Sequence, residues 1–172
     1  MGSDNQVLFV LPNHDFRDEE YLEPKRILSE ADVGCKITAL VSGECRGVNG
    51  TAVTTDYGLD EINPEEFSAI IFVGGVGVED CLKDELVHSV AKTFYELDKL
   101  VCAICWAPAI LANAGILRGK KATVWSGAKN DLEAGGAIYT AEIITIDGNI
   151  ITANGPEASE VFGEEIANRL LG

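Results

Sequence analysis

The residue in this chain whose position best suits covalent chemistry is Cys105. Residues 100–104 form a short run of apolar side chains, which is typical of a fully buried strand. After the cysteine the apolar residues recur at helical spacing, and Pro108 suits a first helical turn, where no N–H donor is needed. Small residues, Ala103 and Ala107, lie two places before and after the cysteine, as the tight turn of a nucleophile elbow requires. The sequence therefore places a thiol where a buried strand turns into a helix.

This placement predicts a reactive thiol. The N-terminus of a helix carries partial positive charge and free N–H groups, both of which favour a thiolate. The backbone N–H of Trp106 can also help to bind an oxyanion. A core position is the alternative for Cys105, because cysteine is among the most buried residue types, although Cys102 in the strand fits that role better. The C-x-x-C spacing of these two also suggests a redox or metal pair, but redox pairs have both sulfurs at the helix start.

Composition favours one soluble domain spanning residues 1–172. The hydrophobic fraction of 47% excludes a disordered chain, and no apolar run reaches the roughly 20 residues of a membrane span. The net charge of −15 argues against nucleic acid, because phosphates would be repelled. The five cysteines are an odd number and do not suggest a disulfide framework, and the polar N-terminus lacks a signal peptide. We expect a cytoplasmic protein with no metal and no cofactor.

Strand and helix patterns alternate along the chain. Polar residues between 44 and 63 suggest a hairpin around Asn49-Gly50, and Asp18 suits an N-cap. Apolar runs predict strands at 6–11, 35–41, 69–73, 100–104, 122–125, 138–146 and 149–153. Helices are expected from Asp18 to near Gly34, and over 85–97, 107–114, 130–134 and 157–171. Buried strands that alternate with helices predict an α/β three-layer sandwich with a mainly parallel central sheet.

Ligands on such sheets bind at the carboxyl ends of the strands. Three loops should meet there: residues 14–20, residues 74–79 and the pair 105–106. The second loop begins with the glycine turn Gly74-Gly75, whose backbone N–H groups can come close to a ligand.

Residues 103–119 resemble the A-I-C-H-G-P-x-x-L-x-x-A-G-x-L-R-G signature of the PfpI intracellular peptidases, in the ThiJ/PfpI superfamily. The similarity extends over nearly the whole chain. It includes the first strand at 7–10, the Phe16…Glu20…Pro24 pattern, the stretch from Val73 to Glu79, and residues 147–153. The resemblance implies a flavodoxin-like, class I glutamine amidotransferase-like fold.

Carried over position by position, the resemblance implies a set of site residues. Cys105 is the nucleophile, and Glu20 matches the glutamate beside its sulfur. Gly75 and Trp106 would supply the N–H groups of the oxyanion hole. Glu79 matches the acidic residue that, in the peptidases, reaches the active site of a neighbouring subunit. A homo-oligomer, dimer or hexamer, is therefore implied.

One departure from the family pattern affects the chemistry. The family places histidine directly after the cysteine as general base and acid, whereas this chain has Trp106, whose indole N–H only donates. General acid–base catalysis contributes about 10²–10⁴-fold, so its loss should be severe for peptide cleavage. His14, in the loop after the first strand, is the substitute base that the sequence offers. The alternative for His14 is a loop histidine that is hydrogen-bonded to Asp15 or Asp18. The alternative for Glu20 is a carboxylate that only interacts favourably with the dipole at the start of its helix.

Two main functions follow from this site. The first is a stress-related, cysteine-nucleophile enzyme of hydrolase or glyoxalase type, acting on a small carbonyl compound, with a peptide as the other substrate class. Aldehydes tolerate the missing histidine because no amine has to leave. The second is a non-catalytic redox sensor in which Cys105 is oxidised to a sulfinate beside Glu20. A catalytically inactive structural homologue is a third possibility.

Overall fold

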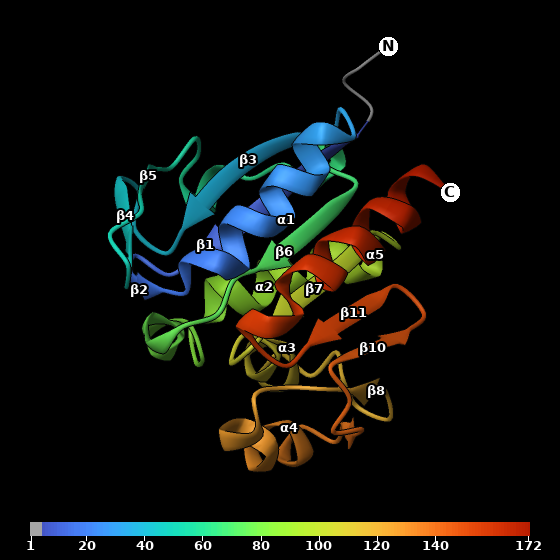
Figure 1. The fold of residues 1–172 in the computed structure, drawn as a ribbon. Helices are drawn as coiled ribbons and strands as arrows, with labels where there is room; N and C mark the ends of the chain where they lie inside the picture. The colour runs from blue at the N-terminus through green and yellow to red at the C-terminus, as the bar shows by residue number, and fades with distance from the viewer. Residues whose placement is uncertain (1–4) are drawn as a thin grey trace.

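A six-stranded sheet forms the centre of the computed structural model, which describes residues 5–172 (Figure 1). The polar start of the chain considered above, residues 1–4, lies outside the described residues. The strand order is β10-β11-β7-β6-β1-β3, and every neighbouring pair is parallel except β10 with β11. The strands are β1 (Gln6–Leu11), β3 (Gly34–Ala39), β6 (Ala69–Phe72), β7 (Leu100–Ile104), β10 (Ile144–Asp147) and β11 (Ile150–Ala153).

Helices cover both faces of this sheet, as Figure 1 shows. One face packs on α1 (Asp18–Glu30) and α5 (Ser159–Leu171), which also contact each other. The other face packs on α2 (Glu85–Glu96) and α3 (Pro108–Asn113), and α4 (Lys129–Ala134) packs against α3. The three-layer α/β fold expected from the sequence is confirmed.

The strands are apolar on both sides because each face contributes to a separate core. In β7, Val101 and Ala103 belong to the core under α2 and α3, whereas Cys102 and Ile104 belong to the core under α1 and α5. Successive side chains of a strand point to opposite faces, so a continuous apolar run is what a doubly covered strand requires. Cys102 is fully buried, as its position in the strand predicted.

Two smaller sheets lie beside the main one. Strands β2 (His14–Phe16), β4 (Glu44–Gly47) and β5 (Ala52–Thr54) form the first, and β4 and β5 are the hairpin expected around Asn49-Gly50. Strands β8 (Lys121–Ala122) and β9 (Ile138–Tyr139) form the second.

The single strand predicted for residues 138–146 is wrong. The segment divides into β9 and β10, which belong to different sheets. Ala141 between them has a φ of 57°, a left-handed conformation that ends an extended run. The hydrophobic pattern alone does not reveal this break, because both halves are rich in residues that favour strands.

The prediction of Asp18 as an N-cap is also wrong. Helix α1 begins at Asp18 itself, and its N-cap Arg17 makes no side-chain capping bond. The buried Asp18 carboxylate accepts the backbone N–H groups of Asn49 at 2.8 Å and Thr51 at 3.0 Å. Burial alone would raise the pKa of Asp18, but hydrogen bonds from Thr51 and Asn49 outweigh it and lower this pKa. The carboxylate therefore ties the turn of the β4–β5 hairpin to the start of α1.

Replacing Asp18 by asparagine should lower the free energy of unfolding at pH 7 by about 1–3 kcal/mol. The amide has one neutral acceptor oxygen, whereas the carboxylate has two charged oxygens and accepts one N–H group on each. Since the folded pKa lies below the ordinary value of 3.8, this contribution is present above that pH and is lost as the pH falls. Urea unfolding at pH 7 and pH 3 measures both effects. The exposed Asp131→Asn is the matched control, and an equal loss in both variants would contradict the assignment.

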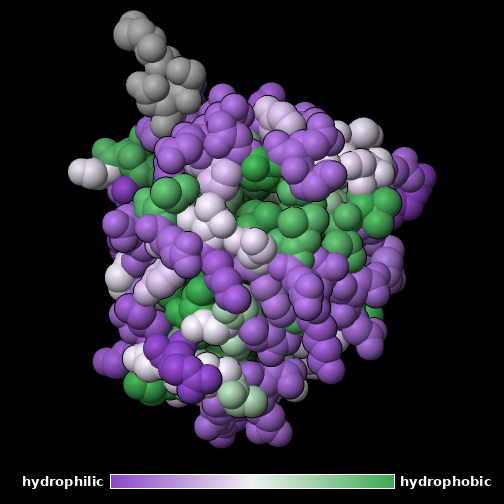
Figure 2. Space-filling model, turned by 180° about the vertical axis from the view of Figure 1, so that it is seen from behind, coloured by the Kyte–Doolittle hydropathy of each residue, from purple (hydrophilic) through white to green (hydrophobic). Residues whose placement is uncertain are grey.

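The face of the molecule drawn in Figure 2 is mainly hydrophilic, in keeping with the net charge of −15. Figure 2 shows hydrophobic groups gathered in a belt among hydrophilic ones on the face seen from behind. Within residues 5–172, no helix combines the length and apolar character needed to cross a membrane.

Candidate active site

Cys105 lies at a strained corner between β7 and α3. Its φ is +65°, in the left-handed region that residues other than glycine rarely adopt and that costs about 1–3 kcal/mol. Two backbone hydrogen bonds hold the corner: Cys105 donates to Ala153 at 2.9 Å and accepts from Trp125 at 2.7 Å. The nucleophile elbow expected from the spacing of Ala103 and Ala107 is therefore present in the backbone.

The Glu20 carboxyl lies on the inner side of the Cys105 sulfur, within hydrogen-bonding range of it. Glu20 comes from the first turns of α1 and is fully buried. Neither carboxyl oxygen receives a hydrogen bond from an N–H or O–H group of residues 5–172. Burial raises the pKa of Glu20 to about 8, although the positive charge of Arg17 opposes the rise. Glu20 is therefore protonated at neutral pH and can donate a hydrogen bond to the sulfur.

Gly74 makes this meeting possible. A Cβ atom at this position would lie 2.6 Å from the Cβ of Cys105 and 2.9 Å from Oε1 of Glu20. The next residue, Gly75, has a φ of +114° and approaches the backbone of Asp15 and Arg17 so closely that a side chain would collide with it. Glycine is required at both positions because three chain segments converge on the sulfur.

The thiol itself does not show the lowered pKa that the sequence suggested. Burial, together with the negative charge of an ionised Glu20, raises the pKa of Cys105 to about 12, while the N–H groups of Trp106 and Gly75 act in the opposite direction. Helix α3 has only six residues, so its dipole is too weak to outweigh burial. When the pair loses its first proton, the single negative charge is shared by the two groups. The two N–H groups face the sulfur and favour that charge on Cys105.

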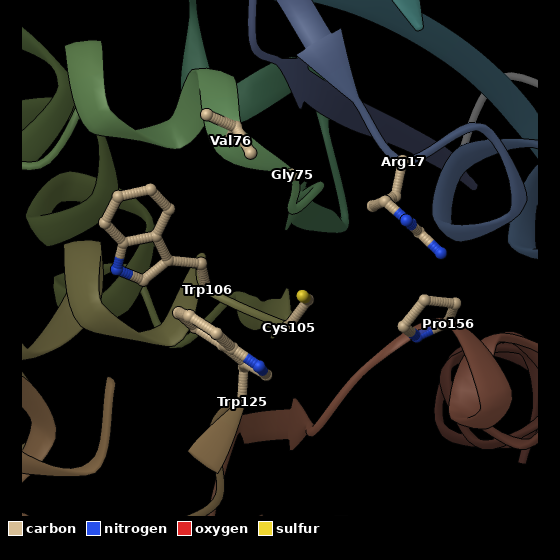
Figure 3. Close-up of a pocket in the computed structure, with 7 residues that line it drawn as sticks. All are labelled: Arg17, Gly75, Val76, Cys105, Trp106, Trp125 and Pro156. Atoms are coloured by element: carbon tan, nitrogen blue, oxygen red, sulfur yellow. The ribbon is translucent and has the colours of Figure 1, made fainter. Parts of the chain in front are cut away.

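A cavity of about 550 Å³ opens on the other side of the sulfur. In Figure 3 the Cys105 sulfur points into it, with two indole rings on one side and Arg17 and Pro156 on the other. The lining residues come from the loops after several strands, at the carboxyl edge of the sheet: Arg17, Gly75, Val76, Cys105, Trp106, Trp125 and Pro156. Three of the predicted site residues, Gly75, Cys105 and Trp106, are therefore brought together at this cavity, with Glu20 behind the sulfur.

Sequence reasoning missed Arg17 and Trp125. Trp125 was expected at the end of a strand, but it lies beyond β8, and its ring meets that of Trp106 edge to face, with centroids 6.2 Å apart. Arg17 also lines a second cavity of about 320 Å³ beside the first. Arg17 lies in the loop 14–20 that the sequence already placed at the carboxyl edge, so its loop was predicted but not its role, whereas no sequence pattern pointed to Trp125.

His14 is not brought to the Cys105 sulfur. It lies in β2, is exposed, and does not line the cavity. Its Nδ1 lies 2.9 Å from Asp15 Oδ2, and its Nε2 lies 2.8 Å from Asp80 Oδ2. Protonated His14 donates hydrogen bonds to Asp15 and to Asp80, and these two bonds, that to Asp15 first, raise the pKa of His14. The expectation that His14 replaces the missing base is therefore not supported by its position, whereas the alternative, a bond to Asp15, is observed.

Glu79 is exposed on the 3-10 helix Val76–Asp80 and does not line the cavity of its own chain. Its predicted contact with a neighbouring subunit stays a prediction. No group of three metal-ligating side chains occurs within residues 5–172.

Comparison with known proteins places this geometry in a family. A model described as the DJ-1/PfpI family matches residues 5–169. The deglycase PH1704 of Pyrococcus horikoshii is 34% identical over 151 residues, which are 88% of this chain and 90% of that protein. General stress protein 18 of Bacillus subtilis is 31% identical over 159 residues, 91% and 92% of the two chains. The crystal structure of a ThiJ/PfpI domain protein from Brachyspira murdochii has a TM-score of 0.96 at 32% identity and covers 98% of each chain. The chain therefore belongs to the DJ-1/PfpI family, within the ThiJ/PfpI superfamily.

Proposed function

We propose that this protein is a cysteine-nucleophile enzyme that acts on small electrophilic carbonyl compounds, such as a 2-oxoaldehyde or its adduct. The observation that carries the proposal is the environment of one atom. The Cys105 sulfur has a buried carboxyl on one side, two backbone N–H groups facing it, and an open cavity on the other side. The name of the deglycase relative agrees with an aldehyde-derived substrate.

The reaction follows from these groups. The sulfur of Cys105 bonds to the aldehyde carbon, and the carbonyl oxygen takes up the negative charge and then a proton. The N–H groups of Gly75 and Trp106, which face the sulfur, stabilise that oxyanion in this proposal. With a pKa of about 8, Glu20 is ionised in only a minor fraction of molecules at neutral pH, and in that form it accepts the thiol proton and later returns one. Transfer of the aldehyde hydrogen to the neighbouring carbon as a proton gives a 2-hydroxy thioester. Water then cleaves the thioester, so that the sum is 2-oxoaldehyde plus water to 2-hydroxy acid.

Peptide cleavage is the less favoured activity. The leaving amine needs a proton donor, and none of the residues that line the cavity is a histidine. In Figure 3 the indole nitrogen of Trp106 lies on the side of the ring away from the Cys105 sulfur. An aldehyde has no leaving amine, so the same site suits it better.

Incubation with methylglyoxal tests the proposal. We expect loss of the aldehyde and formation of lactate, measured by chromatography, and no measurable release of peptides from casein. Hydrolysis of casein without any conversion of methylglyoxal would overturn the choice of substrate. Absence of both would remove the enzymatic assignment altogether.

Oxidation sensing is the second candidate, because Cys105 is partly exposed beside Glu20 while Cys45, Cys81 and Cys102 are buried. Mild peroxide should then add about 32 Da at Cys105, the mass of two oxygens in a sulfinate. Peptide mass spectrometry locates the added mass. Oxidation spread equally over Cys35 and Cys105 would contradict a sensor.

A further inference from the structure

The cavity beside Cys105 is much larger than a three-carbon aldehyde requires. Its volume of about 550 Å³ falls in the range of about 300–1,000 Å³ that is typical of pockets for drug-sized ligands. The side chains of Val76, Trp106, Trp125 and Pro156 give it a mainly apolar lining. A small, water-soluble aldehyde would leave most of this apolar surface in contact with water, so the shape indicates a larger substrate.

Two indole rings form one side of the cavity. The rings of Trp106 and Trp125 meet edge to face, with an interplanar angle of 67°. Trp125 is 47% exposed, so a bound molecule can cover part of its surface. Aromatic pairs gain about 0.5–1.5 kcal/mol beyond the area they bury, which favours a flat aromatic ring over an aliphatic group here.

Arg17 supplies the positive charge at the cavity, and the other six lining residues carry no charged side chain. Its guanidinium forms an ion pair with the carboxylate of the partly exposed Glu19 at 3.6 Å, longer than a hydrogen bond, and its buried Nε has no hydrogen-bond partner among residues 5–172. Glu20 is protonated at neutral pH and adds no second negative charge beside Arg17. In a chain with a net charge of −15, an arginine so placed favours an anionic group on the ligand.

We propose that the cavity binds aromatic carbonyl compounds that carry an acidic group, with the ring against Trp106 and Trp125 and the anion at Arg17. The carbonyl carbon then lies beside the Cys105 sulfur, which points into the same cavity (Figure 3). This substrate class rests on the proposed function for its chemistry. The binding itself does not depend on turnover and can be measured separately.

Three probes separate the two interactions. Benzoylformate has a phenyl ring, a ketone and a carboxylate, pyruvate lacks the ring, and acetophenone lacks the carboxylate. The chain has two tryptophans, and both line the cavity, so intrinsic fluorescence reports on this site without added labels. Titration calorimetry gives the dissociation constants independently. We expect benzoylformate to bind at least about tenfold more tightly than either of the other probes.

Trp125→Ala should weaken the binding of benzoylformate and acetophenone by about tenfold and change the dissociation constant of pyruvate by no more than about twofold. Trp125→Phe should retain most of the affinity for all three probes. Arg17→Gln should weaken the binding of benzoylformate and pyruvate by about tenfold and leave the affinity for acetophenone unchanged. Arg17→Lys is the control that conserves the charge. Circular dichroism and thermal unfolding establish that each variant is folded.

Equal binding of pyruvate and benzoylformate would overturn the proposal, and so would a Trp125→Ala variant that loses affinity for all three probes alike. The outcome is independent of the methylglyoxal assay. Lactate formation without selective benzoylformate binding removes this inference but keeps the proposed function. Selective binding without any turnover keeps the ligand class and removes the proposed function.

Discussion

Replacing Cys105 by serine is expected to lower the conversion of methylglyoxal by a factor on the order of 10³ or more. A serine hydroxyl has nearly the same size, so the corner between β7 and α3 should keep its backbone hydrogen bonds to Ala153 and Trp125. The hydroxyl ionises far less readily than the thiol, and Glu20 is already protonated at neutral pH and cannot act as a strong base. Lactate formation in the steady state measures the loss.

Cys35→Ser is the matched control for this experiment. Cys35 is half-buried near the start of β3, at the amino end of the sheet, while Cys105 follows the carboxyl end of β7. The control should keep full activity and incorporate one equivalent of iodoacetamide at Cys105. Comparable turnover by Cys105→Ser and the wild type would show that the thiol is not the nucleophile.

The Glu20→Gln variant is expected to lose activity and gain stability at the same time. Loss of the carboxyl removes the group that moves protons at the sulfur, which should lower turnover by about 10²–10⁴-fold. The amide is neutral at every pH, so the fold no longer has to keep a buried carboxyl protonated. Lower activity together with higher stability would identify a catalytic carboxyl, whereas removal of a purely structural carboxyl would lower both activity and stability.

The pH dependence gives the sign of this stability change. The folded pKa of Glu20 is about 8, above its ordinary value of 4.5, so the folded state keeps a proton that the unfolded state releases as the pH rises. Stability therefore decreases from about pH 4.5 to about pH 8 and levels off above. At pH 7 the free energy of unfolding of the wild type should be about 3 kcal/mol lower than below pH 4.5, because each pKa unit corresponds to about 1.4 kcal/mol. In urea unfolding, the free energy of unfolding of Glu20→Gln minus that of the wild type should increase with pH through this range. A difference that does not change with pH would contradict the raised pKa.

Alkylation provides a second measurement of the same pair. The rate of Cys105 modification by iodoacetamide should rise with pH through about 8 in the wild type, when the pair loses its first proton. In Glu20→Gln the rise should move above the ordinary thiol value of 9, because the buried thiol then titrates alone.

The sequence by itself determined the local elements and the position of the nucleophile. Fully apolar runs such as residues 100–104 predict doubly covered strands, because only such strands can bury both faces. The small residues around Cys105 predict a tight corner, since steric limits on a turn act within a few residues. The same local reasoning failed for residues 138–146, where a left-handed residue with no strong sequence signal divides the segment between two sheets.

Only the tertiary structure decided what surrounds the sulfur. Glu20, Gly74 and Cys105 are separated by tens of residues and meet only because the strands that precede their loops are neighbours in one parallel sheet. The protonation of Glu20 and Cys105 depends on burial, which no spacing in the sequence encodes. The same is true of the cavity, where Arg17 and Trp125 take part and His14 does not. The physical reason is that pKa values and cavities are set by atoms packed in three dimensions, whereas sequence patterns record only neighbours along the chain.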